Sequence, residues 1–368
     1  MTSVEQIKVW TEKFGFDEGE VEILLRCHNS LANPKDREGS FLNLLAHSFP
    51  YVFFFLPRDE IKNRINLVEN HILPKAFGEK LKKAIFPAKG DESEAEAIEL
   101  LLKGVADCCK GDADETLGVL FDCSKGPDDT VDPKDIIQLS YQLSISSEVL
   151  VSPNIDENRV LTLSQHPLVL HGLTNSLSDA ATKRGGKVTK QVFVEWSKRC
   201  VPHLGAVLQG FIYNLVFHGK SSHSQTPPFT NPELLDSSNI FNENNAGNLF
   251  AISCMSPDLG GKWRRLFSSM EPAVDLHDLE TAISSYVGPS IFVIKTDSDH
   301  LIGGVAESGW KFGYFMFEIE PFARIHHATG GTRKYFIRHN VEHQSTAHGL
   351  VPGPTIYVQD RSNGSLGH

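Results

Sequence analysis

The sequence predicts an α+β protein, with an all-α first part and an α+β second part. Upstream of residue 219, apolar residues recur at the three- and four-residue spacing of amphipathic helices. Downstream of residue 236, short β-type runs alternate with turn residues. The stretch between them is rich in Ser, Pro and polar residues, which is typical of a linker. We therefore divide the chain into a helical module at residues 1–218, a linker at 219–236 and a second domain at 237–368.

Helical periodicity in the first module predicts helices over Val4–Phe14, Glu18–Cys27, Asp59–His71, Glu92–Cys109, Glu115–Phe121, Ile136–Leu143 and Lys190–Arg199. The longer apolar run Val201–Phe217 contains His203, Gln209 and Asn214. A bilayer span needs about twenty mostly apolar residues, so this run favours a buried core helix. The shorter run Phe49–Leu56 is also interpreted as a core segment.

Strand-like runs in the second domain are Leu249–Ser253, Ser290–Lys295, Tyr314–Ile319, Lys334–Ile337 and Thr355–Gln359, with a helix predicted over Leu276–Tyr286. The best-defined feature is an antiparallel hairpin in which Ser290–Lys295 and a strand from Leu301 flank the polar turn 297–299. Gly303 and Gly304 lie inside the second strand of this hairpin. Adjacent glycines there indicate a bulge, or a backbone pressed against another element.

Composition excludes several functional classes. The 368 residues carry a net charge of −11 and no basic stripe, which argues against nucleic-acid binding. The six cysteines show no CxxC spacing and fit reduced thiols in a cytosolic protein. The N-terminus has no signal-sequence pattern, and Thr2 stands where N-myristoylation requires glycine. We therefore expect a cytoplasmic protein whose contact with a membrane is indirect.

A calcium site is the first chemical candidate, in an acidic segment between two predicted helices. Its candidate ligands are Asp122, Ser124, Asp128, Asp132 and Asp135. If Val131 is the apolar residue of an EF-hand loop, the loop is two residues too long, and Asp135 replaces the closing Glu. A second loop, Ala181–Val192, has Gly186 and Val188 correctly placed, but its ligand positions hold Ala181, Lys183, Gly185 and Val192.

These departures predict an EF-hand-like helical module that has largely lost calcium, so no metal is expected. The alternative interpretation of the acidic segment is a helix N-cap region, and we favour it. A calcium-responsive adaptor that uses the Asp122–Asp135 loop stays open as an alternative function.

Catalytic motifs give little support to an enzyme. His339, Glu342 and His343 fit the H-x-x-E-H zinc-protease pattern, but the motif follows a strand-like run where zinc chemistry needs both histidines on one helix face. Cys108 and Cys109 are adjacent on a predicted helix, so buried packing is favoured over redox chemistry. The glycine pairs form neither a P-loop nor a dinucleotide fingerprint. We expect a protein that is not an enzyme and uses no cofactor.

Four blocks of the second half form a recognisable combination: residues 262–269, residues 288–310, residues 315–317 and residues 329–330. Through these blocks the second half resembles a TLDc domain, and the whole chain is most similar to the mTOR-associated, lysosomal branch of that family. The positions that match the family pattern are Trp263, Gly288, Pro289, Gly303, Gly304, Ser308, Trp310, Thr329 and Gly330. Val194-Glu195-Trp196 and Val201-Pro202-His203 also resemble that branch.

The resemblance implies an antiparallel β-sandwich of two sheets with flanking helices and no established catalytic residue. It further implies a non-enzymatic regulator or adaptor in lysosomal mTOR signalling that binds the vacuolar-type proton pump. A role in oxidative-stress resistance is the alternative that the wider family implies. By the same resemblance the protein is cytoplasmic, with peripheral contact at the lysosomal membrane.

One departure from the family concerns the C-terminus. The family pattern closes with an acidic–apolar strand and a terminal tryptophan, and the sequence up to His368 has neither. We therefore expect a C-terminally shortened TLDc domain, in which a lost strand would leave an unpaired sheet edge.

Overall fold

The computed structural model describes residues 4–32, 42, 58–87, 93–152, 170–217, 229–241, 246–270, 276–306, 313–327 and 355–360. The chain forms two compact units, which we call the helical unit and the sheet unit. The helical unit comprises residues 1–168, 181–197 and 202–230, and the sheet unit comprises residues 169–180, 198–201 and 231–368. Two short segments that precede the predicted linker are thus grouped with the sheet, a grouping that periodicity alone did not suggest.

Every helix predicted upstream of residue 218 is confirmed, and Asp59–His71 divides into an α-helix and a π-helical turn. In chain order the elements are α1 (Val4–Phe14), α2 (Glu18–Ala32), α4 (Arg58–Leu67), η1 (Val68–Ile72), α5 (Phe77–Ile85), α6 (Glu94–Cys109), α7 (Ala113–Ser124), α8 (Pro133–Val151), α10 (His171–Thr182), α11 (Lys190–Cys200) and α12 (Gly205–Phe217).

Side-chain caps fix where three of these helices begin. Ser93 precedes α6 and Asp112 precedes α7, and each forms a capping box with the Glu three residues later. Asp132 accepts a hydrogen bond from the Lys134 amide at 2.8 Å and precedes the N1 proline of α8. The favoured interpretation of the acidic segment as a helix N-cap region is therefore confirmed at Asp132.

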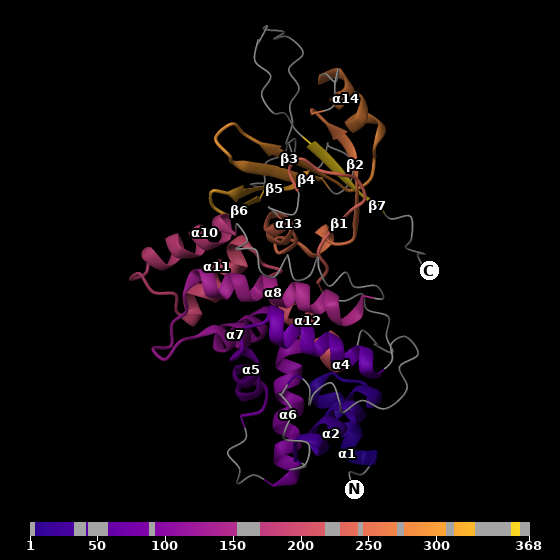
Figure 1. Cartoon of the computed structure of the whole chain (residues 1–368), viewed down its shortest axis with the longest axis vertical. Helices are drawn as coiled ribbons and strands as arrows, with labels where there is room; N and C mark the ends of the chain where they lie inside the picture. Colours follow the sequence, from indigo (N-terminus) through magenta and orange to yellow (C-terminus); the bar gives the residue numbers. More distant parts are fainter. Residues whose placement is uncertain are drawn as a thin grey trace. The chain divides into compact units, whose positions relative to one another are not determined.

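Helix α12 forms the centre of the helical unit, where it packs against α8, α7 and α6 (Figure 1). Every residue of α12 except Gln209 is buried, as the core-helix prediction required. Asn214 donates to Ser147 Oγ at 2.8 Å and Gln209 to Thr116 Oγ1 at 3.2 Å, so the side-chain NH2 group of each residue has a partner. Within the described ranges no single helix could cross a membrane, although α11 and α12, bent by 98°, have the combined length and composition.

The sheet unit contains helices and one seven-stranded sheet within its described residues. Its helices beyond residue 231 are α13 (Ala246–Ser253), the 3-10 turn η3 (Pro257–Leu259) and α14 (Leu276–Ser285). The strand order is β1-β2-β7-β3-β4-β5-β6 (Figure 1). The strands are β1 (Glu233–Leu234), β2 (Lys262–Ser268), β3 (Ser290–Lys295), β4 (Leu301–Ala306), β5 (Gly313–Glu320), β6 (Arg324–His327) and β7 (Thr355–Asp360).

The two faces of this sheet differ in burial. Along β5, Phe315, Phe317 and Ile319 are buried, while Met316 and Glu318 between them are half-buried. The fully buried face continues through Val293 of β3. On the other face Phe267 and Phe292 form a smaller cluster, against which Leu279 and Ala282 of α14 pack. The side chains on one face of the sheet are therefore fully buried, while those on the other face belong to a smaller and partly buried cluster.

Two predictions about this half need correction. The run Leu249–Ser253 was predicted as a strand and lies in helix α13, which is buried almost all round, so its apolar run showed no helical period. The two-sheet antiparallel sandwich is not what the described strands form. They make one continuous sheet, and its β1–β2 pair is parallel.

The sequence predicted an unpaired sheet edge near the C-terminus, but the last described strand, β7, is not at an edge. It pairs antiparallel with β2 on one side and β3 on the other, so it lies in the interior of the sheet. The edges among the described strands are β1 and β6.

The predicted segments Phe49–Leu56 and Lys334–Ile337 lie outside the described residues.

Candidate functional site

The acidic loop of the helical unit is one half of a paired structure. Residues 125–132 connect α7 to α8, and residues 183–189 connect α10 to α11. We call these two connections the loop pair. Val131 and Val188, the residues placed at equivalent loop positions from the sequence, form an antiparallel bridge in which the Val131 amide donates to the Val188 carbonyl at 3.1 Å. Both valines are buried.

Two predicted calcium ligands form ion pairs with lysines: Asp122 near the end of α7 and Asp128 within the first loop. Asp122 lies 3.0 Å from Lys190 Nζ and 3.3 Å from Lys125 Nζ. Asp128 lies 3.2 Å from Lys187 Nζ. Hydrogen bonds from Thr130 and from Lys187 hold the pKa of the Asp128 carboxyl below its usual value. The first loop therefore already has cationic partners for two of its predicted calcium ligands.

The remaining predicted calcium ligands have helical roles. Ser124 Oγ donates to the Leu120 carbonyl at 3.0 Å within α7. Asp132 caps α8, and Asp135 lies in the first turn of that helix. Within the described parts of the chain, no three His, Cys, Asp or Glu side chains are arranged to hold a metal ion.

Sequence reasoning missed the lysines and the glycine that complete this site. Lys80 of α5 donates to the Lys125 carbonyl at 2.9 Å, at the C-terminal end of α7. Lys190 passes over Gly118 of α7, where an added Cβ would lie 2.7 Å from Lys190 Cε. The signal in the sequence was the basic character of residues 183–190, in which Lys183 and Lys187 stand at positions where calcium loops carry oxygen ligands.

The glycine pair of the predicted hairpin lies at the centre of the sheet. Gly303 pairs with Val293 of β3 and Phe317 of β5, while Gly304 pairs with Phe292 and Met316. A Cβ on Gly303 would lie 2.3 Å from both the Phe292 carbonyl oxygen and the Phe317 ring. One on Gly304 would lie 2.5 Å from the Phe292 ring.

Of the two alternatives for the glycine pair, the close approach of the backbone to another element is confirmed, because the backbone there is pressed against its neighbours. The register shifts between β4 and β5 lie outside the pair, at Leu301/Ile302 and Val305/Ala306.

The other family positions fall into two groups. Trp263 on β2 is 2% exposed, and its ring meets Phe241 edge to face at 6.4 Å. Gly288 and Pro289 precede β3, and a Cβ on Gly288 would lie 2.6 Å from the Tyr286 hydroxyl. Outside the described residues lie Ser308, Trp310, Thr329 and Gly330, together with the zinc-motif residues His339, Glu342 and His343.

A contact that the sequence did not predict joins α10 to the β5–β6 turn within the sheet unit. The Ala323 amide donates to the Gly172 carbonyl at 2.9 Å, and Ser176 Oγ donates to the Ala323 carbonyl at 2.8 Å. Asn175 donates to the Pro321 carbonyl at 3.1 Å. A Cβ on Gly172 would lie 1.6 Å from the Ile319 carbonyl oxygen, so only glycine permits this approach.

All six cysteines are among the described residues and form no disulfide, and most of them are buried. Burial raises the pKa of the Cys108 and Cys109 thiols, which disfavours the thiolate that redox chemistry requires. Burial likewise raises the pKa of Cys123 to about 12. Adjacent cysteines at the end of α6 thus act as packing groups.

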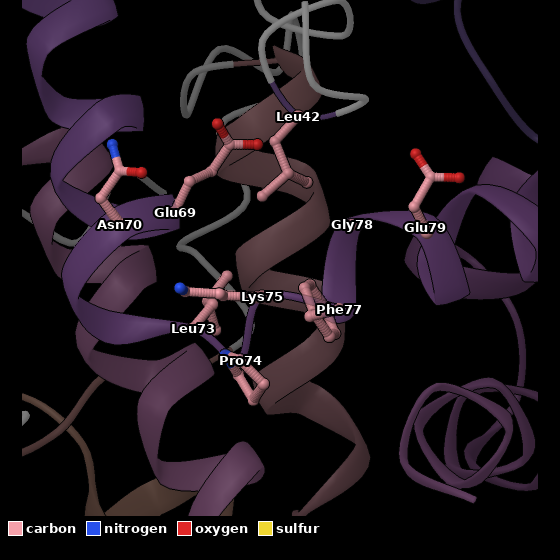
Figure 2. A pocket seen from close by; sticks show the side chains of 9 residues that line it. All are labelled: Leu42, Glu69, Asn70, Leu73, Pro74, Lys75, Phe77, Gly78 and Glu79. Atoms are coloured by element: carbon pink, nitrogen blue, oxygen red, sulfur yellow. The ribbon is translucent and has the colours of Figure 1, made fainter.

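A pocket of about 240 Å³ opens beside η1 in the helical unit. Figure 2 shows its apolar wall of Leu42, Leu73 and Phe77, and the carboxylates of Glu69 and Glu79 on separate elements. The carboxylates do not converge on one point in this view, and the lining residues carry no arrangement with a defined chemistry (Figure 2).

Comparison with known protein families identifies one domain in the chain. Residues 234–359 match the family model described as the TLDc domain. No curated protein matches the chain. The matched range lies within the sheet unit and includes every strand from β2 to β6.

Proposed function

We propose, from the TLDc domain at residues 234–359, that this chain is a non-enzymatic regulatory adaptor that docks on a large protein assembly. The assembly that the resemblance favours is the vacuolar-type proton pump at the lysosomal surface, with a role in mTOR signalling. The protein would act from the cytoplasm and contact the membrane through its partner.

The observation that supports an adaptor role is the construction of the domain around Gly303 and Gly304. Neighbouring strands leave no room for a side chain at either position, so the interior strand β4 is tightly held. A sheet held in this way presents its edges and loops in a fixed geometry, and pre-organisation reduces the entropy cost of binding. The domain is therefore suited to docking.

We also propose that the loop pair is an EF-hand-like module. Support comes from the bridge between Val131 and Val188, which joins two helix–loop–helix segments back to back. The ion pairs of Asp122 and Asp128 favour a module that works without calcium.

Affinity purification tests the adaptor proposal. The tagged full chain is expressed in cells, and lysosome-enriched membranes are solubilised with a mild detergent before mass spectrometry. We expect proton-pump subunits and mTOR components above the level of a tag-only sample. Recovery of neither would contradict the proposal.

Two variants sharpen this experiment. Gly303→Ala strains β4 and should reduce recovery of the partners, because its Cβ meets a backbone oxygen. Gly78→Ala in α5 is the matched control, since the nearest atom to its Cβ among the described residues would be Leu42 Cγ at 3.9 Å. Equal recovery with both variants would show that capture does not depend on the sheet.

A further inference from the structure

Lys187 of the second loop and Lys190 at the start of α11 supply cations to the acidic segment at the end of α7 and in the first loop. Lys187 and Lys190 flank Val188, the residue that bridges to Val131. Their ammonium groups reach Asp128 and Asp122 at 3.2 and 3.0 Å. The two ion pairs therefore lie on either side of the only backbone bridge described between the loops.

Gly118 leaves the space that the side chain of Lys190 occupies. Asp122 lies one helical turn after Gly118 on α7, so the two share a face of the helix. The absent side chain at Gly118 leaves a channel in which the Lys190 stem lies, with Cε 2.7 Å and Nζ 2.9 Å from where a Cβ would be. Lys125 also reaches Asp122, which makes a small network of opposite charges.

Two glycines with positive φ set the backbone direction just before Lys187. Gly185 and Gly186 have φ values of +100° and +82°, a region that favours glycine. The Gly186 amide donates to the Ala181 carbonyl at 2.9 Å and closes the end of α10. The chain then runs directly into Lys187 and Val188 beside the first loop.

We propose that Lys187 and Lys190 are the resident cations of the loop pair, and that their charge keeps the Val131–Val188 bridge closed without a metal ion. The inference deepens the EF-hand-like part of the proposed function and is independent of the partner proposal. It also predicts a means of opening the loop pair, because acylation of either lysine removes its charge.

Loss of the Lys187 and Lys190 charges is expected to affect the loop pair and not the rest of the fold. The lysine side chains are 67% and 52% exposed, so each ion pair is weak and salt-sensitive. Val131 and Val188 are buried, but the loop residues around them are mostly exposed or half-buried. Local opening of such a segment requires less free energy than global unfolding, so two weak ion pairs can shift its equilibrium. Hydrogen exchange of the loop amides is therefore the sensitive measurement.

Hydrogen–deuterium exchange of the full chain tests the proposal. In the variant Lys187→Gln/Lys190→Gln, we expect peptides containing Val131 and Val188 to exchange roughly two- to ten-fold faster, with other peptides unchanged. Lys187→Arg/Lys190→Arg should restore wild-type exchange because it keeps both charges. Lys134→Gln is the control, since Lys134 is exposed on α8 and has no ion pair among the described residues.

Two results would overturn the proposal. One is unchanged exchange at Val131 and Val188 in the Gln variant. The other is wild-type exchange in these peptides that slows with millimolar calcium, which would assign the closure to a metal. If the Gln variant fails to fold, the wild-type chain still decides the matter. Raising NaCl from about 0.05 M to about 1 M should accelerate exchange in the same two peptides, because salt screens exposed charges, and no acceleration there would contradict the inference.

Discussion

The carbonyl of Gly172 accepts a hydrogen bond from the amide of Ala323 at 2.9 Å, which joins the start of α10 to the β5–β6 turn. Ala323 is fully buried at this contact. Ser176 and Asn175, on the next turn of α10, donate to the same turn of the sheet. A segment far from the matched TLDc range is thus a packed part of the sheet unit.

Gly172→Ala should destabilise the sheet unit. The new Cβ would lie 1.6 Å from a backbone oxygen of Ile319, and no side-chain rotation can relieve that clash. We expect a loss of roughly 1–3 kcal/mol or more, measured by urea unfolding of the full chain. Gly78→Ala, also at the second position of a helix, should cause no such loss because the nearest atom is 3.9 Å away. Equal stability of the two variants would contradict the contact.

Substitutions at Gly303 and Gly304 should differ in whether they can be rescued. Gly304→Ala collides with the Phe292 ring, so adding Phe292→Leu should recover part of the lost stability. Gly303→Ala collides with the Phe292 carbonyl as well as the Phe317 ring, so adding Phe317→Leu should not rescue it. Double-mutant cycles from urea unfolding measure the two couplings. Similar rescue at both sites would show that the backbone clash at Gly303 is not limiting.

Gly118→Ala should have opposing effects on α7. Alanine in a helix interior is favoured over glycine by about 0.8–1 kcal/mol. The new Cβ would also displace Lys190 from Asp122, and an exposed ion pair contributes about 0.2–1 kcal/mol. We expect a net change near zero in the wild-type background and the full helical gain in a Lys190→Ala background. The same gain in both backgrounds would mean that Lys190 does not use the Gly118 channel.

The buried thiol of Cys123 should make stability fall in alkaline solution. Its pKa is raised from 9.0 in the unfolded chain to about 12 in the fold, so only the unfolded chain releases the proton between these values. The contribution of the protonated Cys123 thiol to the free energy of unfolding is fully present below pH 9 and is lost as pH rises toward 12. The free energy of unfolding between pH 8 and about pH 10 should therefore fall less steeply in Cys123→Ala than in wild type. An identical slope would contradict the assignment.

The sequence by itself determined the division into a helical and a mixed half, because the helical period and the β-type runs are local properties. It also located the hairpin at Ser290–Lys295 and placed Val131 and Val188 each at the apolar position of its own loop, while the bridge between them came from the structure. The run Leu249–Ser253 was assigned wrongly, because a segment buried on all sides shows no period.

Only the tertiary structure decided how distant segments meet. It placed β7 between β2 and β3, and it brought Lys187 and Lys190 to the carboxylates of Asp128 and Asp122. It also showed why Gly118 and Gly172 carry no side chain. These features depend on residues up to about 150 positions apart, and their energies arise from close approach and charge after folding. Local periodicity therefore carries no signal for them.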